Sequence, residues 1–291
     1  ESFDELVAIN RVSKDVGVNA KISIRVNPDI DPKTHPYIST GLKTSKFGIA
    51  IEDSYDAYIE ASKMKNIDVV GIDAHIGSQI FDLQPFEDSL LRLEELYHKL
   101  NDLGINIRFI DIGGGLGIKY KDDDIPPTKK EFAEKIIKTM KKINCSLILE
   151  PGRSLVGNAG YLISKVLYKK KSNQKNFLII DAGMNDILRP SLYNAYHKVS
   201  KSIQASDNSE IFDIVGPICE TGDVISYDTT LNDAKIGDNI IIHSAGAYGS
   251  VMSSNYNSRP KVPEVLVSGK SMSLIRKRET IEQILENEVV L

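Results

Sequence analysis

The chain has 291 residues and a formal net charge of −4, with 36 Lys and Arg against 40 Asp and Glu. That length and an apolar fraction of 41% exclude a disordered chain and favour two domains, or one barrel with an extension. The acidic balance argues against nucleic acid as a partner, and no apolar run approaches the roughly 20 residues of a membrane helix. Two cysteines, Cys145 and Cys219, cannot form a disulfide scaffold, so we expect a cytoplasmic protein.

The first part of the chain alternates between helix and strand patterns. A first helix is expected at the start, with Phe3, Leu6, Val7 and Ile9 on one face, and later helices repeat apolar residues every three or four positions. This alternation with short links predicts a parallel sheet covered by helices. The elements expected after the first helix are the strand Lys21–Asn27, the helix Ser54–Met64, the strand Val69–Gly77, the helix Phe86–Leu103 (ended by Gly104), the strand Ile107–Ile112, the helix Glu131–Ile143 and the strand Leu147–Glu150.

The pattern changes after about residue 158, where strands follow one another with few helices. We therefore expect a partial (β/α)8 TIM-like barrel over residues 1–158 and a mainly β domain over residues 159–291. A half barrel leaves unpaired parallel edges, and a complete doubly wound sheet is the alternative. The later elements expected are the strands Tyr161–Tyr168, Phe177–Asp181, Asn239–His243 and Glu264–Val267 and a closing helix at Glu279–Glu286.

Polar residues and glycines follow the successive strands of the first part. Reactive residues of barrels gather at the carboxyl ends of strands, so we expect these positions to share one site. They combine a ring, a hydroxyl, a flexible turn, a carboxylate and a guanidinium. The residues are Asn27, His75 with Ser78, the turn Gly113, Gly114 and Gly115, and Glu150 with Gly152 and Arg153.

Each of these signals also has a plainer interpretation. The glycine run can close backbone N–H groups around an anion, or it can be only a tight turn; its spacing does not fit a dinucleotide-binding G-x-G-x-x-G. His75 can be a buried core side chain, and Gly77 and Ser78 beside it favour an anion site. The five histidines are dispersed without a zinc motif, so no metal is expected, and the other four are interpreted as structural.

Candidates for cofactor and substrate binding lie at the end of the first part and in the second part. Glu150 at a strand end could keep a heterocyclic nitrogen protonated, and Arg153 can bind a phosphate or carboxylate in a fork. Arg189 and Tyr193 lie four residues apart, and Cys219 stands beside Glu220 in a Gly- and Pro-rich loop. Tyr248 lies between glycines in another loop.

These strings in this order resemble the diaminopimelate decarboxylase family, pyridoxal phosphate enzymes of the alanine-racemase-like (fold type III) class. HIGSQ, GGG and EPGR are shared with ornithine and arginine decarboxylases and indicate the class. THPYISTG, RPSLY, CETGD and NYNSRP are more particular to the diaminopimelate branch. The resemblance covers nearly the whole chain.

The resemblance implies pyridoxal-phosphate-dependent decarboxylation of meso-diaminopimelate to L-lysine and CO2, in a homodimer with shared active sites. It places His75 on the pyridine ring, Ser78 and the three glycines on the phosphate, and Glu150 on the pyridine nitrogen. Cys219 would return a proton to the α-carbon. It also implies that Gly152 and Arg153 reach phosphate and substrate, that Arg189 and Tyr193 hold a substrate carboxylate, that Glu220 binds the distal ammonium, and that Tyr248 touches both molecules.

One departure is large, because no lysine here matches the family's YAxKAN-like string that carries the cofactor lysine. Glu1 is also not an initiator Met, so we expect a piece of a longer chain that is inactive alone, with that lysine upstream. Two alternatives remain open: a decarboxylase of another basic amino acid or of a carboxyspermidine-type substrate, and a non-catalytic homologue that regulates a partner decarboxylase.

Overall fold

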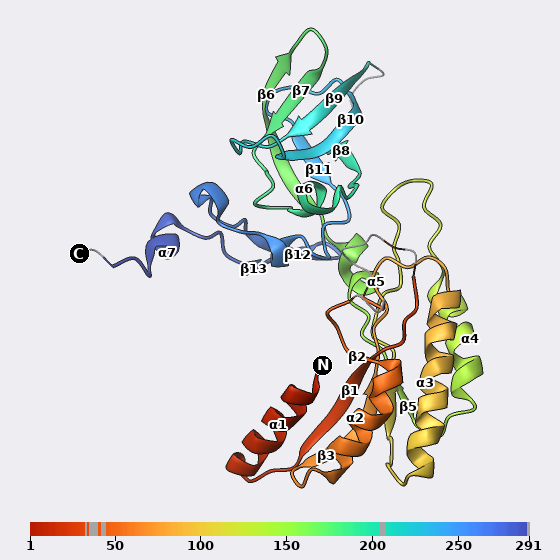
Figure 1. The fold of residues 1–291 in the computed structure, drawn as a ribbon. Helices are drawn as coiled ribbons and strands as arrows, with labels where there is room; N and C mark the ends of the chain where they lie inside the picture. The colour runs from red at the N-terminus through yellow and green to blue at the C-terminus, as the bar shows by residue number, and fades with distance from the viewer. Residues whose placement is uncertain (33, 35–39, 42–44, 204–207, 290–291) are drawn as a thin grey trace. The chain divides into compact units, whose positions relative to one another are not determined.

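The computed structural model describes residues 1–32, 34, 40–41, 45–203 and 208–289, which form two units (Figure 1). Unit 1 comprises Glu1–Lys119 and Asp124–Leu155, and unit 2 comprises Tyr120–Asp123 and Val156–Leu291. Within the described ranges, no helix combines the length and the apolar character needed to cross a membrane. The predicted fold class, α/β followed by a mainly β part, is confirmed. The division after residue 158 stays a prediction.

Unit 1 is built on five parallel strands in the order β2-β1-β3-β4-β5. The helices α2, α3 and α4 lie along one side of this sheet, as a barrel segment requires (Figure 1). The strands are β1 (Ala20–Asn27), β2 (Ile49–Ala50), β3 (Ile67–Asp73), β4 (Phe109–Asp111) and β5 (Ser146–Ile148), and the helices are α1 (Phe3–Val16), α2 (Ile51–Lys63), α3 (Gln84–Asp102), α4 (Lys129–Met140) and the short α5 (Arg153–Val156).

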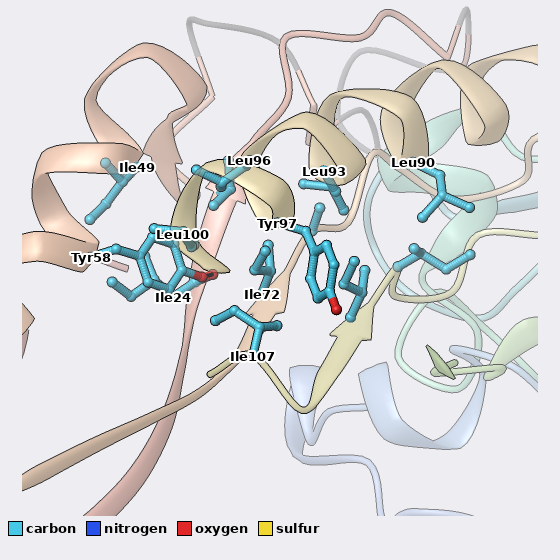
Figure 2. Close-up of a cluster of buried hydrophobic side chains, with 14 of the residues drawn as sticks. Ile24, Ile49, Tyr58, Ile72, Leu90, Leu93, Leu96, Tyr97, Leu100 and Ile107 are labelled. Carbon is cyan, nitrogen blue, oxygen red and sulfur yellow. Dashed lines mark hydrogen bonds between the residues drawn. The ribbon is translucent and has the colours of Figure 1, made fainter. Parts of the chain in front are cut away.

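The core of unit 1 lies between the sheet and its helices (Figure 2). The predicted apolar face of α3 is buried apart from Leu103, which follows the helix where Gly104 turns the chain at φ 78°. Tyr58 is fully buried, and its hydroxyl donates to the carbonyls of Ile24 (3.2 Å) and Gly71 (2.9 Å). These bonds satisfy the phenol inside the core, and burial raises the Tyr58 pKa above its usual value.

The predicted apolar face of α1 is partly wrong. Leu6 is buried and Ile9 packs against the core, but Phe3 and Val7 are exposed. The buried line of this helix runs through Leu6, Ile9 and Ser13, and Val7 lies about 100° round the helix from Leu6.

Unit 2 contains a six-stranded sheet in the order β10-β9-β7-β6-β11-β8, in which only the β7–β9 pair is parallel among the described strands. Buried apolar residues such as Leu178, Ile180 and Phe212 form its core. The unit also has the two-stranded sheet β12-β13. The strands are β6 (Leu162–Lys171), β7 (Asn176–Ile180), β8 (Val199–Lys201), β9 (Ser209–Val215), β10 (Val224–Asn232), β11 (Asn239–Ile242), β12 (Glu264–Ser268) and β13 (Ser271–Arg276), and the helices are α6 (Arg189–Tyr193) and α7 (Ile281–Leu285).

Candidate functional site

The glycine turn after β4 is a conformation that only glycine can adopt without displacing its surroundings. Gly113 has φ 67° and Gly115 has φ 114°. A Cβ on Gly114 would lie 2.3 Å from the carbonyl oxygen of Glu150, and one on Gly115 would lie 2.4 Å from that of Gly77. The turn is therefore a place where three strand ends approach one another backbone to backbone.

The three backbone amides of this turn differ in whether they already donate a hydrogen bond within the protein. Gly113 N donates to the Asp111 carboxylate (2.8 Å), and Gly114 N donates to Nδ1 of His75 (3.2 Å). Among the described residues, no hydrogen bond is made by the Gly115 amide. That amide is consequently the one of the three with capacity for an anion, and the cradling role predicted for all three glycines stays a prediction.

His75 lies two residues beyond the end of β3 and is a neutral ring. Its Nδ1 accepts the Gly114 amide, so the ring proton is on Nε2. Burial, with a contribution from the Arg25 charge, lowers the His75 pKa to about 4. The Thr40 hydroxyl also donates to the His75 carbonyl (2.6 Å) and ties this strand end to the preceding loop.

Ser78 and Arg153, predicted to lie together, do so in the structure. The buried Arg153 guanidinium donates to Ser78 Oγ from Nε (3.2 Å) and from NH2 (3.0 Å). A guanidinium, a hydroxyl and a glycine backbone form a donor set that suits a phosphate group. Unit 1 thus fits the phosphate end of pyridoxal phosphate.

Glu150 follows β5 by two residues and has an exposed side chain. Its backbone amide donates to the Gly113 carbonyl (2.8 Å), which fixes the β5 end against the glycine turn. The exposed carboxylate is therefore attached to a well-positioned backbone. This arrangement is suited to an ion pair with a protonated heterocycle.

Two further carboxylates, which the sequence analysis did not single out, lie at the same strand ends. Asp73 ends β3 and Asp111 ends β4, and the two residues are directly paired in the sheet. Burial, the Asp111 charge and the Glu150 charge raise the Asp73 pKa to about 7, although the Arg25 charge opposes the shift. The only sequence signal was an Asp in the last position of each strand.

An apolar groove of about 370 Å³ lies beside the glycine turn, between it and α4. Side chains such as Phe132, Ile136, Leu147 and Leu149 line it. The lining also includes the three glycines and the polar side chains of Lys129 and Ser154.

In unit 2, the motif RPSLY forms the short helix α6 and buries its arginine. Arg189 NH1 donates to Nε2 of His197 (2.8 Å), and its guanidinium lies 4.7 Å from the centre of the Tyr120 ring. Tyr193 ends the helix, and Asn194 then turns the chain at φ 50°. Arg189 and Tyr193 therefore project from one short, tightly ended helix.

The loop with Cys219 and Glu220 is exposed, and hydrogen bonds to the Asp223 side chain fix its base. The Asp223 carboxylate accepts the amides of Ile218 (2.7 Å) and Met184 (2.6 Å). Burial raises the Asp223 pKa, and the two amide bonds oppose the shift. The loop is consequently fixed at its base, and Cys219 and Glu220 stand at its outer end.

The segment NYNSRP places two side chains on this loop that the sequence analysis did not assign. The Tyr256 hydroxyl donates to the Glu220 carboxylate (2.6 Å), and Asn257 Nδ2 donates to Sγ of Cys219 (3.4 Å). The hydrogen bond to Glu220 raises the Tyr256 pKa. Both outer residues of the loop therefore have an orienting partner.

Tyr248 stands in a tight turn with φ 59°, which is an uncommon conformation for an aromatic residue. Gly249 behind it has no room for a Cβ, which would lie 2.3 Å from the Ala245 carbonyl. The side chain is exposed. Backbone strain of this kind is concentrated at functional positions.

The predicted site residues are divided between the two units. His75, Ser78, the three glycines, Glu150 and Arg153 belong to unit 1, with Gly152 in open space. Arg189, Tyr193, Cys219, Glu220 and Tyr248 belong to unit 2. Of the histidines interpreted as structural, His98 is exposed on α3, His197 and His243 lie in unit 2, and His35 lies outside the described residues.

Comparison with known proteins identifies the family of the chain. Residues 1–157 match the family described as pyridoxal-dependent decarboxylase, pyridoxal binding domain. The diaminopimelate decarboxylase of Aquifex aeolicus (strain VF5) is 47% identical over 286 residues, which cover 98% of this chain and 68% of that protein. The chain therefore spans about two thirds of the length of this relative.

Solved structures give the same result. Diaminopimelate decarboxylase from Helicobacter pylori, complexed with L-lysine, superposes with a TM-score of 0.94 at 42% identity, covering 98% of this chain and 71% of that one. The M. jannaschii enzyme in co-complex with L-lysine gives a TM-score of 0.93 at 41% identity, covering 100% and 68%. The chain belongs to the diaminopimelate decarboxylase family of pyridoxal-dependent decarboxylases.

Proposed function

We propose that this protein catalyses the pyridoxal-phosphate-dependent decarboxylation of meso-diaminopimelate to L-lysine and CO2, the last step of lysine biosynthesis. The observation that carries the proposal is the likeness over 98% of the chain to a diaminopimelate decarboxylase whose structure holds L-lysine, the expected product. The donor set of unit 1 supports the cofactor, since Ser78, Arg153 and the glycine turn suit a phosphate.

In this proposal the residues of unit 1 hold the cofactor. Ser78, the glycine turn, Gly152 and Arg153 bind its phosphate, and the neutral His75 ring stacks on its pyridine. Glu150 pairs with the pyridine nitrogen and favours its protonated form. When bound, pyridoxal phosphate supplies the electron sink that takes up the electron pair left on the α-carbon as CO2 leaves.

The residues of unit 2 recognise and protonate the substrate. Arg189 and Tyr193 bind the carboxylate that the product keeps, and Glu220 binds the distal ammonium. The Cys219 thiol delivers a proton to the α-carbon, and Asn257 holds the sulfur by its 3.4 Å hydrogen bond. Arg153 and Tyr248 contact both cofactor and substrate.

We further infer a homodimer with shared active sites and a cytoplasmic location. The exposure of Cys219 and Glu220 at the outer end of their loop supports the first, because such residues are available to a second subunit. The two free cysteines support the second. Sedimentation of the holoenzyme, and complementation between Cys219→Ala and Glu150→Ala subunits in mixed dimers, test the shared site.

The function is tested by lysine formation from meso-diaminopimelate, with pyridoxal phosphate, by the full-length gene product. L-Ornithine, L-arginine and L-lysine serve as parallel substrates. Turnover of diaminopimelate alone supports the proposal. Turnover of another amino acid overturns the substrate assignment, and absence of turnover in a folded, cofactor-loaded protein favours a regulatory homologue.

A further inference from the structure

We propose that His197 is a positioning residue that fixes the guanidinium of Arg189 for the carboxylate retained in the product. The inference rests on the proposed function, because it assigns Arg189 to that carboxylate. It concerns a histidine that the sequence pattern did not distinguish from structural histidines. Its basis is the set of contacts around the two side chains.

The hydrogen bonds of His197 leave one protonation state. A guanidinium has only donors, so Nε2 of His197 must accept the bond from Arg189 NH1 at 2.8 Å. Nδ1 lies 2.9 Å from the carbonyl oxygen of His243 and must therefore donate to it. The ring is neutral, with its proton on Nδ1 and its lone pair directed at Arg189.

The position of the ring is set by the sheet and not by the short helix. His243 follows β11, and its amide donates to the Lys198 carbonyl (2.9 Å) beside His197. The strand pairing continues from there, with Val199 opposite Ile242. The acceptor that meets Arg189 is thus attached to the paired ends of β8 and β11, where the backbone is fixed.

The Tyr120 ring is a second contact that restricts the orientation of the Arg189 guanidinium. The Tyr120 ring lies 4.7 Å from the guanidinium carbon and packs edge to face on His197, with ring centres 5.4 Å apart at 84°. All three side chains are buried. One ring face and one ring nitrogen therefore define the plane of the guanidinium.

His197 and Tyr120 orient Arg189 without carrying negative charge. An Asp or Glu in place of His197 would bind the guanidinium more strongly, but it would compete with a substrate carboxylate for the same cation. A neutral acceptor such as His197 uses one N–H group and adds no negative charge beside the guanidinium. The pair is therefore suited to receive a carboxylate in a fixed geometry.

The test uses two variants of the full-length holoenzyme, each of which keeps only one of the two hydrogen bonds of His197. His197→Gln can place its amide oxygen near the position of Nε2 and still accept from Arg189. His197→Asn can place its amide NH2 near Nδ1 and still donate to His243, but it leaves Arg189 without this acceptor. Binding of L-lysine and of cadaverine, which lacks the carboxylate, is measured by calorimetry, and kcat and KM are measured with diaminopimelate.

We expect His197→Asn to weaken L-lysine binding and to raise KM about tenfold, with kcat within about twofold, because an anchor used equally in the ground and transition states changes KM. Cadaverine binding stays unchanged, and His197→Gln remains close to the wild type. Equal losses in the two variants, or for the two ligands, overturn the proposal.

Tyr120→Leu provides a second test if His197→Asn does not fold. It removes the ring face and keeps the His197 acceptor, so L-lysine binding weakens several-fold and cadaverine binding does not change. Parallel loss of both ligands overturns the positioning role. Failure of the wild-type holoenzyme to bind L-lysine overturns the proposed function itself, which separates the two conclusions.

Discussion

Arg153 donates two hydrogen bonds to the single hydroxyl oxygen of Ser78, a residue 75 positions earlier in the chain. A serine hydroxyl has two lone pairs and one proton, so the two bonds occupy both lone pairs. The hydroxyl proton must then point away from the guanidinium. Arg153 thereby orients Ser78 as a donor, and the pair presents a cation and an O–H group to the same region.

Replacing Ser78 by Ala removes that donor and one acceptor of the Arg153 guanidinium. We expect the affinity for pyridoxal phosphate to fall about tenfold or more, since a hydrogen bond to a charged group contributes roughly 1.5–3 kcal/mol. Titration of the apoenzyme with cofactor, followed by absorbance, measures the change. Ser78→Thr retains the hydroxyl and serves as the control; unchanged affinity in Ser78→Ala would contradict a role at the phosphate.

Gly114→Ala is expected to destabilise unit 1, because its Cβ would lie 2.3 Å from the Glu150 carbonyl, a backbone atom that cannot rotate away. Backbone displacement of this kind costs about 1–3 kcal/mol or more. Gly152→Ala is the matched control, since a Cβ there meets nothing within 4 Å and its φ is not positive. Chemical denaturation compares the two, and equal stability would show that the turn yields freely.

Asp73 makes the stability of unit 1 depend on pH. Its pKa rises on folding from 3.8 to about 7, chiefly through burial, so the native state binds more protons than the unfolded state between these values. The free energy of unfolding should therefore fall as pH rises from about 4 to 7. We expect Asp73→Asn to remove on the order of 1–2 kcal/mol of that decrease, after allowance for solvent screening.

Denaturation of the full-length protein at a series of pH values measures this slope. Asp56→Asn, which removes an exposed carboxylate from α2, controls for the change in net charge. A slope in Asp73→Asn as steep as that of the wild type would mean that Asp73 is ionised throughout.

Cys219→Ala removes the proposed proton donor while leaving the cofactor residues of unit 1 untouched. We expect kcat to fall by about 10²- to 10⁴-fold, the usual contribution of a positioned acid. In D2O the residual lysine should carry deuterium on both faces of the former α-carbon, where the wild type labels one face, and NMR of the product distinguishes these. Retained stereospecificity would assign the proton to another group.

The four longer helices of unit 1 and its parallel strands β1, β3, β4 and β5 were predictable because their signals are local. The apolar face of α3 repeats over five turns of helix, β1 alternates apolar and polar residues, and β3 is apolar between Asp68 and Asp73 apart from a glycine. The strands β2, β8, β9, β10 and β13 were not predicted. β8 has only three residues, and β10 contains Asp228 at φ 47° and two register shifts against β9, so its alternation of apolar and polar residues is interrupted.

The residues of the candidate site were likewise predictable only in part. Ser78, the glycine turn and Arg153 could be found because each follows a strand and parallel strands end at one edge. His197, Tyr120, Tyr256 and Asn257 could not, since they act through partners that the fold brings from elsewhere in the chain. Asn194 ends α6 in a left-handed conformation, and this turn was the local signal that the chain reverses and brings His197 back to Arg189.

The four residues Tyr120–Asp123 belong to unit 2, although the residues on both sides of them belong to unit 1. The polypeptide therefore passes between the units at three places, and one cut cannot yield two self-contained pieces. An exchange of the β unit between family members that begins at Val156 would leave behind the Tyr120 ring on Arg189 and the Asp122 carboxylate on Lys198 (2.9 Å). A chimaera should therefore take Tyr120–Asp123 from the same parent protein as the rest of unit 2.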